Sequence, residues 1–537
     1  MLSTSSLYAQ DKVYDVLIRE ALIYDGENTK PFRGDVGIAG EKISGIGNLK
    51  DAKAEKTIDA KGLVLAPGFI DAHTHSDFNP LIYPKLFNKI LQGVTSEVVG
   101  NCGMSAAPVL GGHRKKIREI WAREGVKIPE VNWKSFKEYS KALMAEGLAT
   151  NFVGLVGHGN LRSAVMGYSP KKASKSEIAE MKKMLGQAMS EGAAGVSFGL
   201  IYLPGIFAQK EELVELCREA GKRGGVCAFH MRSEGSRLIE SIEEVISIGR
   251  AAKASIQISH LKAGGKTNWP KIDEAFRLIE KARREGMRIT ADAYPYTATA
   301  VELGVVLPDE IYQREDRVAL FRDPAKRASL LAELREYYQK RKRDWSTVMI
   351  ASVENKKYRK YEGLTIQVIA SETGKEPVAL LVEMLAETNF EVSSFGFSQS
   401  EEGVDRVILR PYVAIGSDSI ADGSRKPHPR AFGTFPKIFS RYSRRQKTLE
   451  LGEAIRKMTS LAADQFGVAG RGRIKEGNFA DLVLFDAAEI RDFSTYESPA
   501  LLPRGVKWVF VNGTAEVKNG KPTGEKAARF LSPHVRL

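Results

Sequence analysis

Short runs of apolar residues, separated by segments with helical spacing, dominate the middle of this chain. Helical patterns follow most of the runs, for example over residues 209–223, 236–252 and 269–284. Continuous apolar runs that alternate with helices are typical of a parallel sheet buried on both faces. Eight runs predict an α/β fold, a (β/α)₈ TIM-like barrel. They occupy residues 63–70, 94–99, 152–156, 194–198, 226–229, 255–258, 288–291 and 412–415.

Both ends of the chain show a different pattern, in which short alternating strands are separated by turn residues. It occurs over residues 13–64 and returns near 480–485 and 506–511. We therefore predict that residues 1–64 and 470–537 pair into a small β-sandwich domain, and that residues 65–469 form the barrel. Two stretches that do not fit the strand–helix alternation, near 111–148 and 301–408, are expected to be insertions.

Composition excludes several classes of protein. With 43% apolar and 27% charged residues, the chain is neither disordered nor fibrous. Its apolar runs are much shorter than the ~20 residues of a membrane span, so we expect no membrane association. Three cysteines do not form a disulfide framework.

The net charge of +14 changes the picture little. The basic residues are scattered and form no stripe interleaved with aromatic residues, so we expect no nucleic-acid partner. The positive field favours anionic small-molecule substrates. Residues 1–11 lack the basic and apolar regions of a signal peptide, which predicts a cytoplasmic protein. The alternative is an exported protein in which residues 1–10 are the remnant of a signal. No motif indicates an oligomeric state.

Side chains that bind metals occur where the predicted strands end. In a barrel, these carboxyl ends build the active site. Two histidines at positions i and i+2 of an extended segment point the same way and can bind one ion. Nitrogen, sulfur and oxygen donors together suit Zn²⁺ with a position open to water. The candidate ligands are His73, His75, Cys102, His230, His260 and Asp418.

Several motifs make the chain resemble a known family. Gly68-Phe-Ile-Asp-Ala-His-Thr-His75 resembles the first-strand signature of the amidohydrolase superfamily of metal-dependent hydrolases. Gly100-Asn-Cys-Gly-Met-Ser-Ala-Ala-Pro108 resembles the cysteine motif of the N-acyl-D-amino-acid deacylases, or D-aminoacylases. Five further segments match the same family in order, over residues 197–205, 229–232, 259–262, 292–296 and 428–433. The resemblance implies zinc-dependent hydrolysis of N-acyl-D-amino acids to a carboxylate and a free D-amino acid.

The resemblance also implies how the metals are held. A tightly bound Zn²⁺ is expected on Cys102, His230 and His260. A second, weaker divalent metal is expected on His73, His75 and Asp418, with Cys102 bridging. Many relatives bridge two metals with a carboxylated lysine, and the fourth predicted strand here ends without one. Asp418 is expected to act as general base and then as general acid.

Other residues are candidates for binding the substrate. Lys262 lies two residues after His260, so its side chain is expected on the same side of the strand and suited to a substrate carboxylate. Arg430 is expected to assist by a bidentate contact, and Tyr294 or Tyr296 by a hydroxyl group. Tyr202 is expected to stabilise the tetrahedral oxygen or to hold the acyl group. The alternatives are surface ion pairs for Lys262 and Arg430, and aromatic packing for Tyr202.

Two rival functions remain open. The same barrel could hydrolyse a dipeptide or a cyclic amide, although the cysteine motif and the missing lysine disfavour this. A non-catalytic barrel module would predict that the metal ligands had been lost, whereas all six are present.

Overall fold

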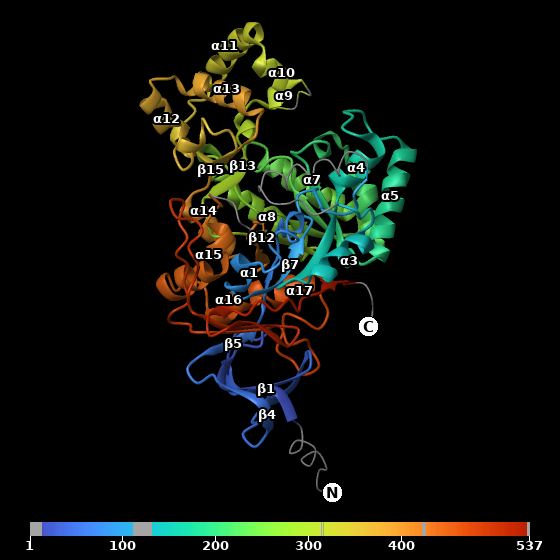
Figure 1. Ribbon diagram of the computed structural model, residues 1–537. Coiled ribbons are helices and arrows are strands. Elements are labelled where there is room, and N and C mark those ends of the chain that lie inside the picture. Colours follow the sequence, from blue (N-terminus) through green and yellow to red (C-terminus); the bar gives the residue numbers. More distant parts are fainter. Residues whose placement is uncertain (1–12, 111–130, 313, 315, 421–425, 534–537) are drawn as a thin grey trace.

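The computed structural model describes residues 13–110, 131–312, 314, 316–420 and 426–533 (Figure 1). Its centre is a barrel of eight parallel strands that pair in chain order. The ring closes where Ala72 N donates to Ile415 O and where Thr74 pairs with Ser419. The predicted TIM-like barrel is thereby confirmed. Its strands are β6 (Phe69–Asp71), β7 (Val94–Val99), β8 (Asn151–Gly157), β9 (Gly195–Gly199), β10 (Val226–His230), β11 (Ser255–Ile258), β12 (Ile289–Ala293) and β16 (Val413–Ile415).

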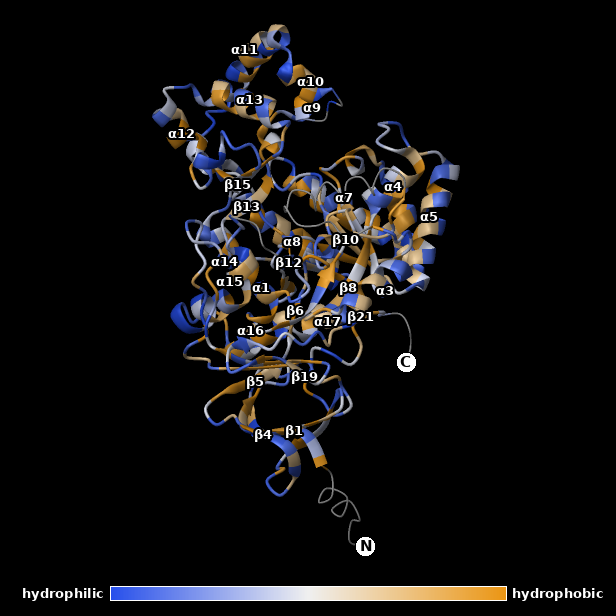
Figure 2. Ribbon diagram, viewed as in Figure 1, coloured by the Kyte–Doolittle hydropathy of each residue, from blue (hydrophilic) through white to orange (hydrophobic). Residues whose placement is uncertain are grey.

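Helices surround this ring and bury the outer face of its strands. Every residue of the eight barrel strands is buried, which explains their continuous apolar sequence. The helices are amphipathic, and Figure 2 shows orange and blue residues mixed along α5 while the strands are largely orange. They are α1 (Phe87–Ile90), α3 (Phe136–Glu146), α4 (His158–Met166), α5 (Lys175–Ser190), α6 (Lys210–Lys222), α7 (Leu238–Ala252), α8 (Lys271–Arg284), α14 (Glu401–Ile408), α15 (Arg430–Lys437), α16 (Leu451–Met458) and α17 (Ser460–Phe466).

Strands from both chain ends form a second sheet below the barrel in Figure 1. It encloses a core of its own that includes Ile18, Val36, Leu482 and Trp508, as predicted for the small β-sandwich domain. The last strand, β21 (Phe530–Leu531), instead pairs with β8 of the barrel, a difference from the expected span 470–537. The sandwich strands are β1 (Val13–Ile23), β2 (Phe32–Ala39), β3 (Lys42–Gly47), β4 (Lys53–Asp59), β5 (Val64–Pro67), β17 (Leu482–Phe485), β18 (Val506–Val511), β19 (Thr514–Lys518) and β20 (Lys521–Pro522).

The apolar run at 63–70 is two strands and not one. Its first half, β5, pairs with β1 and β17 of the sandwich, and its second half, β6, pairs with β7 of the barrel. Gly68 lies between them, where a Cβ atom would come within 2.2 Å of Thr95 Cγ2. The chain therefore passes from one sheet to the other at a residue that cannot carry a side chain without displacing Thr95.

The long insertion forms a separate unit after β12, at the opposite end of the barrel from the sandwich (Figure 1). It has its own core, which includes Leu334, Ile369 and Leu381. The helix that follows it, α14, packs on β12 and β16 and so belongs to the barrel rather than to the stretch expected at 301–408. The insertion contains β13 (Ala298–Glu302), β14 (Val348–Val353) and β15 (Val392–Phe397), and the helices α9 (Asp309–Tyr312), α10 (Arg317–Arg322), α11 (Pro324–Lys340), α12 (Ile366–Thr373) and α13 (Pro377–Thr388).

The first expected insertion, near 111–148, is described in part. Residues 111–130 lie outside the described residues, and the remainder contributes α3, which begins with a Ser135–Glu138 capping box. Within the described part of the chain, no helix combines the length and the apolar character that crossing a bilayer demands.

Candidate metal centre and active site

All six expected metal ligands meet at the carboxyl ends of the barrel strands. One group consists of Cys102, His230 and His260, and the other adds His73, His75 and Asp418 to the same cysteine. Within each group the donor atoms lie within 4.8 Å of one another. Cys102 is shared, so the arrangement is suited to two adjacent ions with a common sulfur ligand.

Three of these residues have a backbone that L-amino acids rarely adopt. The φ angle is +53° at Cys102, +35° at His260 and +51° at Asp418. Such left-handed conformations cost about 1–3 kcal/mol each and persist where the surroundings enforce them. Here Asp418 N donates to His73 O at 2.7 Å, and His260 N donates to Asp292 Oδ1 at 2.8 Å. The strain lies at the residues whose side chains form the cluster.

Cys102 has the electrostatic environment of a thiolate. Its Sγ lies 3.4 Å from His73 Nε2 and 3.5 Å from His260 Nε2. Burial raises the pKa of this thiol, but the positive His73 and His260 and the proximity of His230 bring the pKa well below its usual range. The thiolate is the form that binds metals.

His230 provides the test of whether a metal fits. Its side chain is buried, and neither ring nitrogen has a hydrogen-bonding partner of normal geometry among the described residues. Buried polar atoms are satisfied in nearly all native proteins, so two unsatisfied nitrogens need an explanation. A metal ion held by Cys102, His230 and His260 would supply a partner for one of them. The donor set of one sulfur and two nitrogens fits Zn²⁺.

Two carboxylates that the sequence analysis did not single out orient the histidines. Asp292 Oδ1 lies 3.1 Å from His73 Nδ1, and Glu234 Oε1 lies 2.6 Å from His260 Nδ1. A carboxylate at Nδ1 orients the ring and leaves Nε2, which faces Cys102 in both histidines, as the atom that would bind a metal. Asp292 ends a predicted strand, which was a usable signal. Glu234 lies in a loop four residues after β10, where periodicity carries no information.

Asp418 lies between the cluster and a cation. Its Oδ1 is 3.2 Å from His75 Nε2, and its Oδ2 is 2.8 Å from Arg430 Nη1. Burial raises the pKa of this carboxyl, but Arg430 and His73 outweigh burial and hold the pKa well below its usual range. Asp418 is therefore ionised at neutral pH, which is the form that a general base requires.

The expected substrate-binding residues are distributed around this cluster, with one exception. Lys262 Nζ is buried 2.7 Å from Glu234 Oε1, and the Arg430 guanidinium lies 4.7 Å from the Tyr294 ring centroid. The Tyr202 ring lies 5.0 Å from the ring of His230. Tyr296 points elsewhere: its hydroxyl oxygen is 3.5 Å from Ser494 Oγ, and the structure does not bring it to the cluster.

Comparison with known proteins agrees with this geometry. The pattern described as "Amidohydrolase family" matches residues 56–229 and 411–515. A D-aminoacylase from Alcaligenes xylosoxydans xylosoxydans is 35% identical, over 97% of this chain and 98% of that protein. The chain belongs to the amidohydrolase family. The full-length similarity confirms the resemblance to its D-aminoacylase members that the motifs indicated.

Two solved structures of this family contain the same fold and bind metals. A D-aminoacylase studied for its binuclear metal centre has a TM-score of 0.80 at 33% identity, covering 97% of this chain and all of that one. The N-acyl-D-glutamate deacylase of Bordetella bronchiseptica, in complex with zinc and a phosphonate that mimics the tetrahedral intermediate, has a TM-score of 0.81 at 30% identity. It covers 97% of this chain and all of that one. These structures support a metal centre in this amidohydrolase.

Proposed function

We propose that the protein hydrolyses the amide bond of N-acyl-D-amino acids, releasing a carboxylate and a free D-amino acid, and that its metal is Zn²⁺. The observation that carries this proposal is the cysteine-centred cluster with a buried lysine and arginine beside it. The cluster can hold the reacting amide, and the two cations suit a substrate with a free carboxylate. Full-length similarity to enzymes named for D-amino-acid substrates supports the stereochemistry.

We assign the tightly bound ion to Cys102, His230 and His260, whose donors are one sulfur and two nitrogens. His73, His75 and Asp418 form the weaker position, with Cys102 in common. A bound Zn²⁺ acts as a Lewis acid that polarises a carbonyl group and makes water more acidic.

Asp418 carries the proton in the proposed reaction. Its carboxylate is ionised, so it accepts a proton from the attacking water and then donates it to the leaving amide nitrogen. The ion pair with Arg430 favours this charged state before the reaction. One carboxylate thereby serves both halves of the hydrolysis.

Tyr202 is a neutral hydrogen-bond donor for the charge that develops on the carbonyl oxygen. Burial, together with the negative charges of Cys102 and Asp418, raises the pKa of its hydroxyl well above the usual value. The hydroxyl therefore remains protonated across the working range. A donor placed before the reaction stabilises the developing oxyanion without reorganisation.

Lys262 and Arg430 bind the substrate carboxylate in this proposal. Lys262 lies 2.8 Å from His260 Nδ1 and Arg430 lies 2.8 Å from Asp418, so both cations adjoin the metal ligands. Fixing the carboxylate there and the acyl carbonyl at the metal leaves one direction for the amino-acid side chain. Such a three-point arrangement separates D from L substrates.

A cyclic-amide or dipeptide hydrolase finds no specific support. Strand β9 contains no lysine for a carboxylated bridge, and Cys102 occupies the shared position. Likewise, all six ligand side chains converge, which a non-catalytic barrel would not require.

The direct test is amine release from N-acetyl-D- and N-acetyl-L-amino acids, measured in parallel on zinc-loaded protein. Substrates with neutral and acidic side chains belong in the panel, since the net positive charge would suit the latter. We expect hydrolysis of the D series alone. No hydrolysis of either enantiomer by protein with zinc bound, or a preference for L substrates, would refute the proposal.

A further inference from the structure

The segment between β9 and α6 holds Tyr202 beside the metal ligands. This segment, residues 200–209, is called the Tyr202 loop below. Tyr202 N donates to Gly199 O at 3.2 Å, and Ile206 N donates to Tyr202 O at 2.9 Å. The loop is therefore tied to the end of its own strand on one side and folded back on itself at Ile206. Leu200 N donates to His230 O at 3.0 Å, so the start of the loop is bonded to β10, whereas residues 203–209 make no described backbone hydrogen bond to that strand.

Arg232 connects the later part of the loop to the segment that follows β10. It follows the ligand His230 by two residues, and its side chain reaches the Tyr202 loop. Its Nη1 donates to Ile206 O at 3.0 Å, and its Nη2 donates to Ala208 O at 2.5 Å. Ile206 thus links Arg232 to Tyr202. Its carbonyl oxygen accepts from Arg232, and its amide donates to the carbonyl oxygen of Tyr202.

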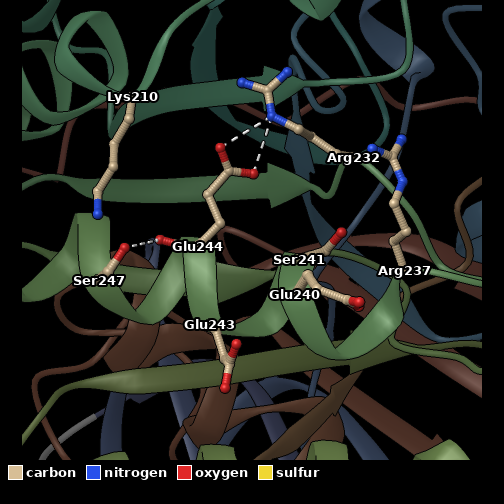
Figure 3. A pocket seen from close by; sticks show the side chains of 8 residues that line it. All are labelled: Lys210, Arg232, Arg237, Glu240, Ser241, Glu243, Glu244 and Ser247. Carbon is tan, nitrogen blue, oxygen red and sulfur yellow. Dashed lines mark hydrogen bonds and ion pairs between the residues drawn. The ribbon is translucent and has the colours of Figure 1, made fainter.

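Glu244 fixes Arg232 from the other side. Both carboxylate oxygens of Glu244, on α7, accept from Arg232 Nε at 3.0 Å. Figure 3 shows the two side chains facing each other, whereas Lys210 and Arg237 extend from the same surface hollow without such a contact. The Arg232 side chain is 23% exposed and that of Glu244 is 20% exposed, so solvent weakens the pair less than at an open surface.

The guanidinium of Arg232 therefore binds both α7, through Glu244, and the Tyr202 loop. Its Nε and both terminal nitrogens are engaged, and none of these contacts is with a metal ligand or with the carboxylate-binding cations. A planar guanidinium that joins three elements has a fixed geometry that lysine cannot reproduce. Its contacts place residues 206–208 of the loop relative to β10, which ends at His230.

We propose that Arg232, held by Glu244, is a positioning residue that sets the hydroxyl of Tyr202 relative to the metal centre. This inference rests on the proposed function, because it requires Tyr202 to act on the acyl carbonyl. Loss of the anchor lets residues 206–208 move, and with them Tyr202, whose carbonyl oxygen accepts from Ile206 N. A displacement of about 1 Å at a reacting group is enough for a ~100-fold loss of rate. The metal ligands themselves keep their contacts.

A double-mutant cycle between Arg232→Met and Tyr202→Phe tests this. Each single variant is expected to lower kcat for an N-acetyl-D-amino acid, by about 10-fold or more for the first and about 100-fold for the second. If Arg232 acts through Tyr202, adding Arg232→Met to Tyr202→Phe costs less than about 3-fold, because coupled residues are not additive. Bound zinc is measured in every variant and is expected to stay unchanged.

Arg250→Gln is the matched control. Arg250 lies on the same helix as Glu244 and pairs with Glu285 at the surface, so its replacement should leave kcat, KM and bound zinc unaltered. Glu244→Gln removes the charge that fixes Arg232, and it should lower kcat in the same direction by a smaller factor. If Arg232→Met does not fold, the double-mutant cycle is measured between Glu244→Gln and Tyr202→Phe instead.

Additive effects in the cycle, or an Arg232→Met variant as active as Arg250→Gln, would overturn the proposal. A loss of bound zinc in parallel with activity would also overturn it, since the effect would then pass through His230. Absence of D-specific hydrolysis in the wild-type protein refutes the proposed function instead. In that case, hydrogen exchange of the amides of residues 200–208 tests separately whether Arg232 anchors the Tyr202 loop. Faster exchange in Arg232→Met than in the wild type supports the anchoring, and unchanged exchange refutes it.

Discussion

Replacing Lys89 by Met removes the cation that joins the strands where the barrel closes. Lys89, on α1, is fully buried and donates to Asp71 Oδ2 at 2.9 Å, Ser417 Oγ at 2.8 Å and Ser419 Oγ at 2.9 Å. Its Nζ also lies 3.4 Å from Glu97 Oε2. These partners belong to β6, to β7 and to the segment after β16, so one ammonium group joins the first and last strands of the barrel. The junction of β6 and β16 is called the seam below.

The expected cost follows from what the substitution leaves behind. Burial lowers the pKa of Lys89, but Asp71 and Glu97 outweigh burial and raise it, so the group is charged. Without it, two buried carboxylates have lost their shared cation. Removing one partner of a buried ion pair typically costs about 3–5 kcal/mol in stability. We expect a loss of that size for Lys89→Met, with a lower urea midpoint.

Activity should fall together with stability, because Ser417 and Ser419 flank Asp418. Ser417 also donates through its backbone amide to Asp71 Oδ1 at 2.7 Å. Opening of the barrel there moves Asp418, the carboxylate to which we assign the proton transfer, and kcat should decrease by about 10-fold or more.

Urea unfolding followed by tryptophan fluorescence measures the first effect, and steady-state kinetics at low urea measures the second. Lys340→Met, which breaks an exposed pair with Glu336, is the control and should leave the urea midpoint at the wild-type value. A midpoint for Lys89→Met equal to that of the control would refute this account of the seam.

Three further predictions concern the site and the sandwich. Asp418→Asn should lower kcat about 10²–10⁴-fold by removing the proton carrier, as steady-state kinetics would show; a variant with wild-type kcat would exclude Asp418 from this role. Lys262→Met should raise KM about 10–100-fold by removing a charge-assisted contact to the substrate carboxylate. An equal loss with an N-acyl amine that has no carboxylate would contradict that assignment. Glu516→Gln should stabilise the protein by on the order of 2 kcal/mol at pH 9 in urea unfolding, with little effect near pH 4. Equal effects at both pH values would contradict the burial argument.

The sign of the effect at Glu516 follows from proton binding. Burial, the largest cause, raises the pKa of this carboxyl from 4.5 to about 8. Between these values the folded protein binds the proton more tightly than the unfolded chain, so stability falls as pH rises. The amide of Gln keeps an acceptor for Ala527 N, which donates to Glu516 Oε1 at 2.9 Å, and has no charge to bury.

Strand-end chemistry made the cluster predictable from sequence. His73 and His75 are two residues apart in an extended segment, and Cys102, His230, His260 and Asp418 each follow a buried apolar run. In a parallel barrel these ends meet, so the topology alone brings the six side chains together.

What the sequence could not predict depends on contacts between distant segments. The run at 63–70 has uniform apolar character, and only the pairing of β5 with β17 shows that half of it belongs to another sheet. Glu234 contacts His260 through the path of its loop, which no periodicity encodes. Tyr296 shares a motif with Tyr294, yet the two hydroxyls lie in different surroundings because Ser494 arrives from the C-terminal region.

The central claim is that the cysteine-centred cluster binds the metal on which D-specific hydrolysis depends. The most direct measurement is a zinc titration of metal-stripped protein, in which bound zinc and hydrolysis of an N-acetyl-D-amino acid are read on the same samples. We predict no hydrolysis before zinc is added, a rise that follows the first equivalent bound, and neither binding nor activity in Cys102→Ala. Full hydrolysis by the metal-free protein, or zinc-restored activity in Cys102→Ala equal to wild type, would contradict the account.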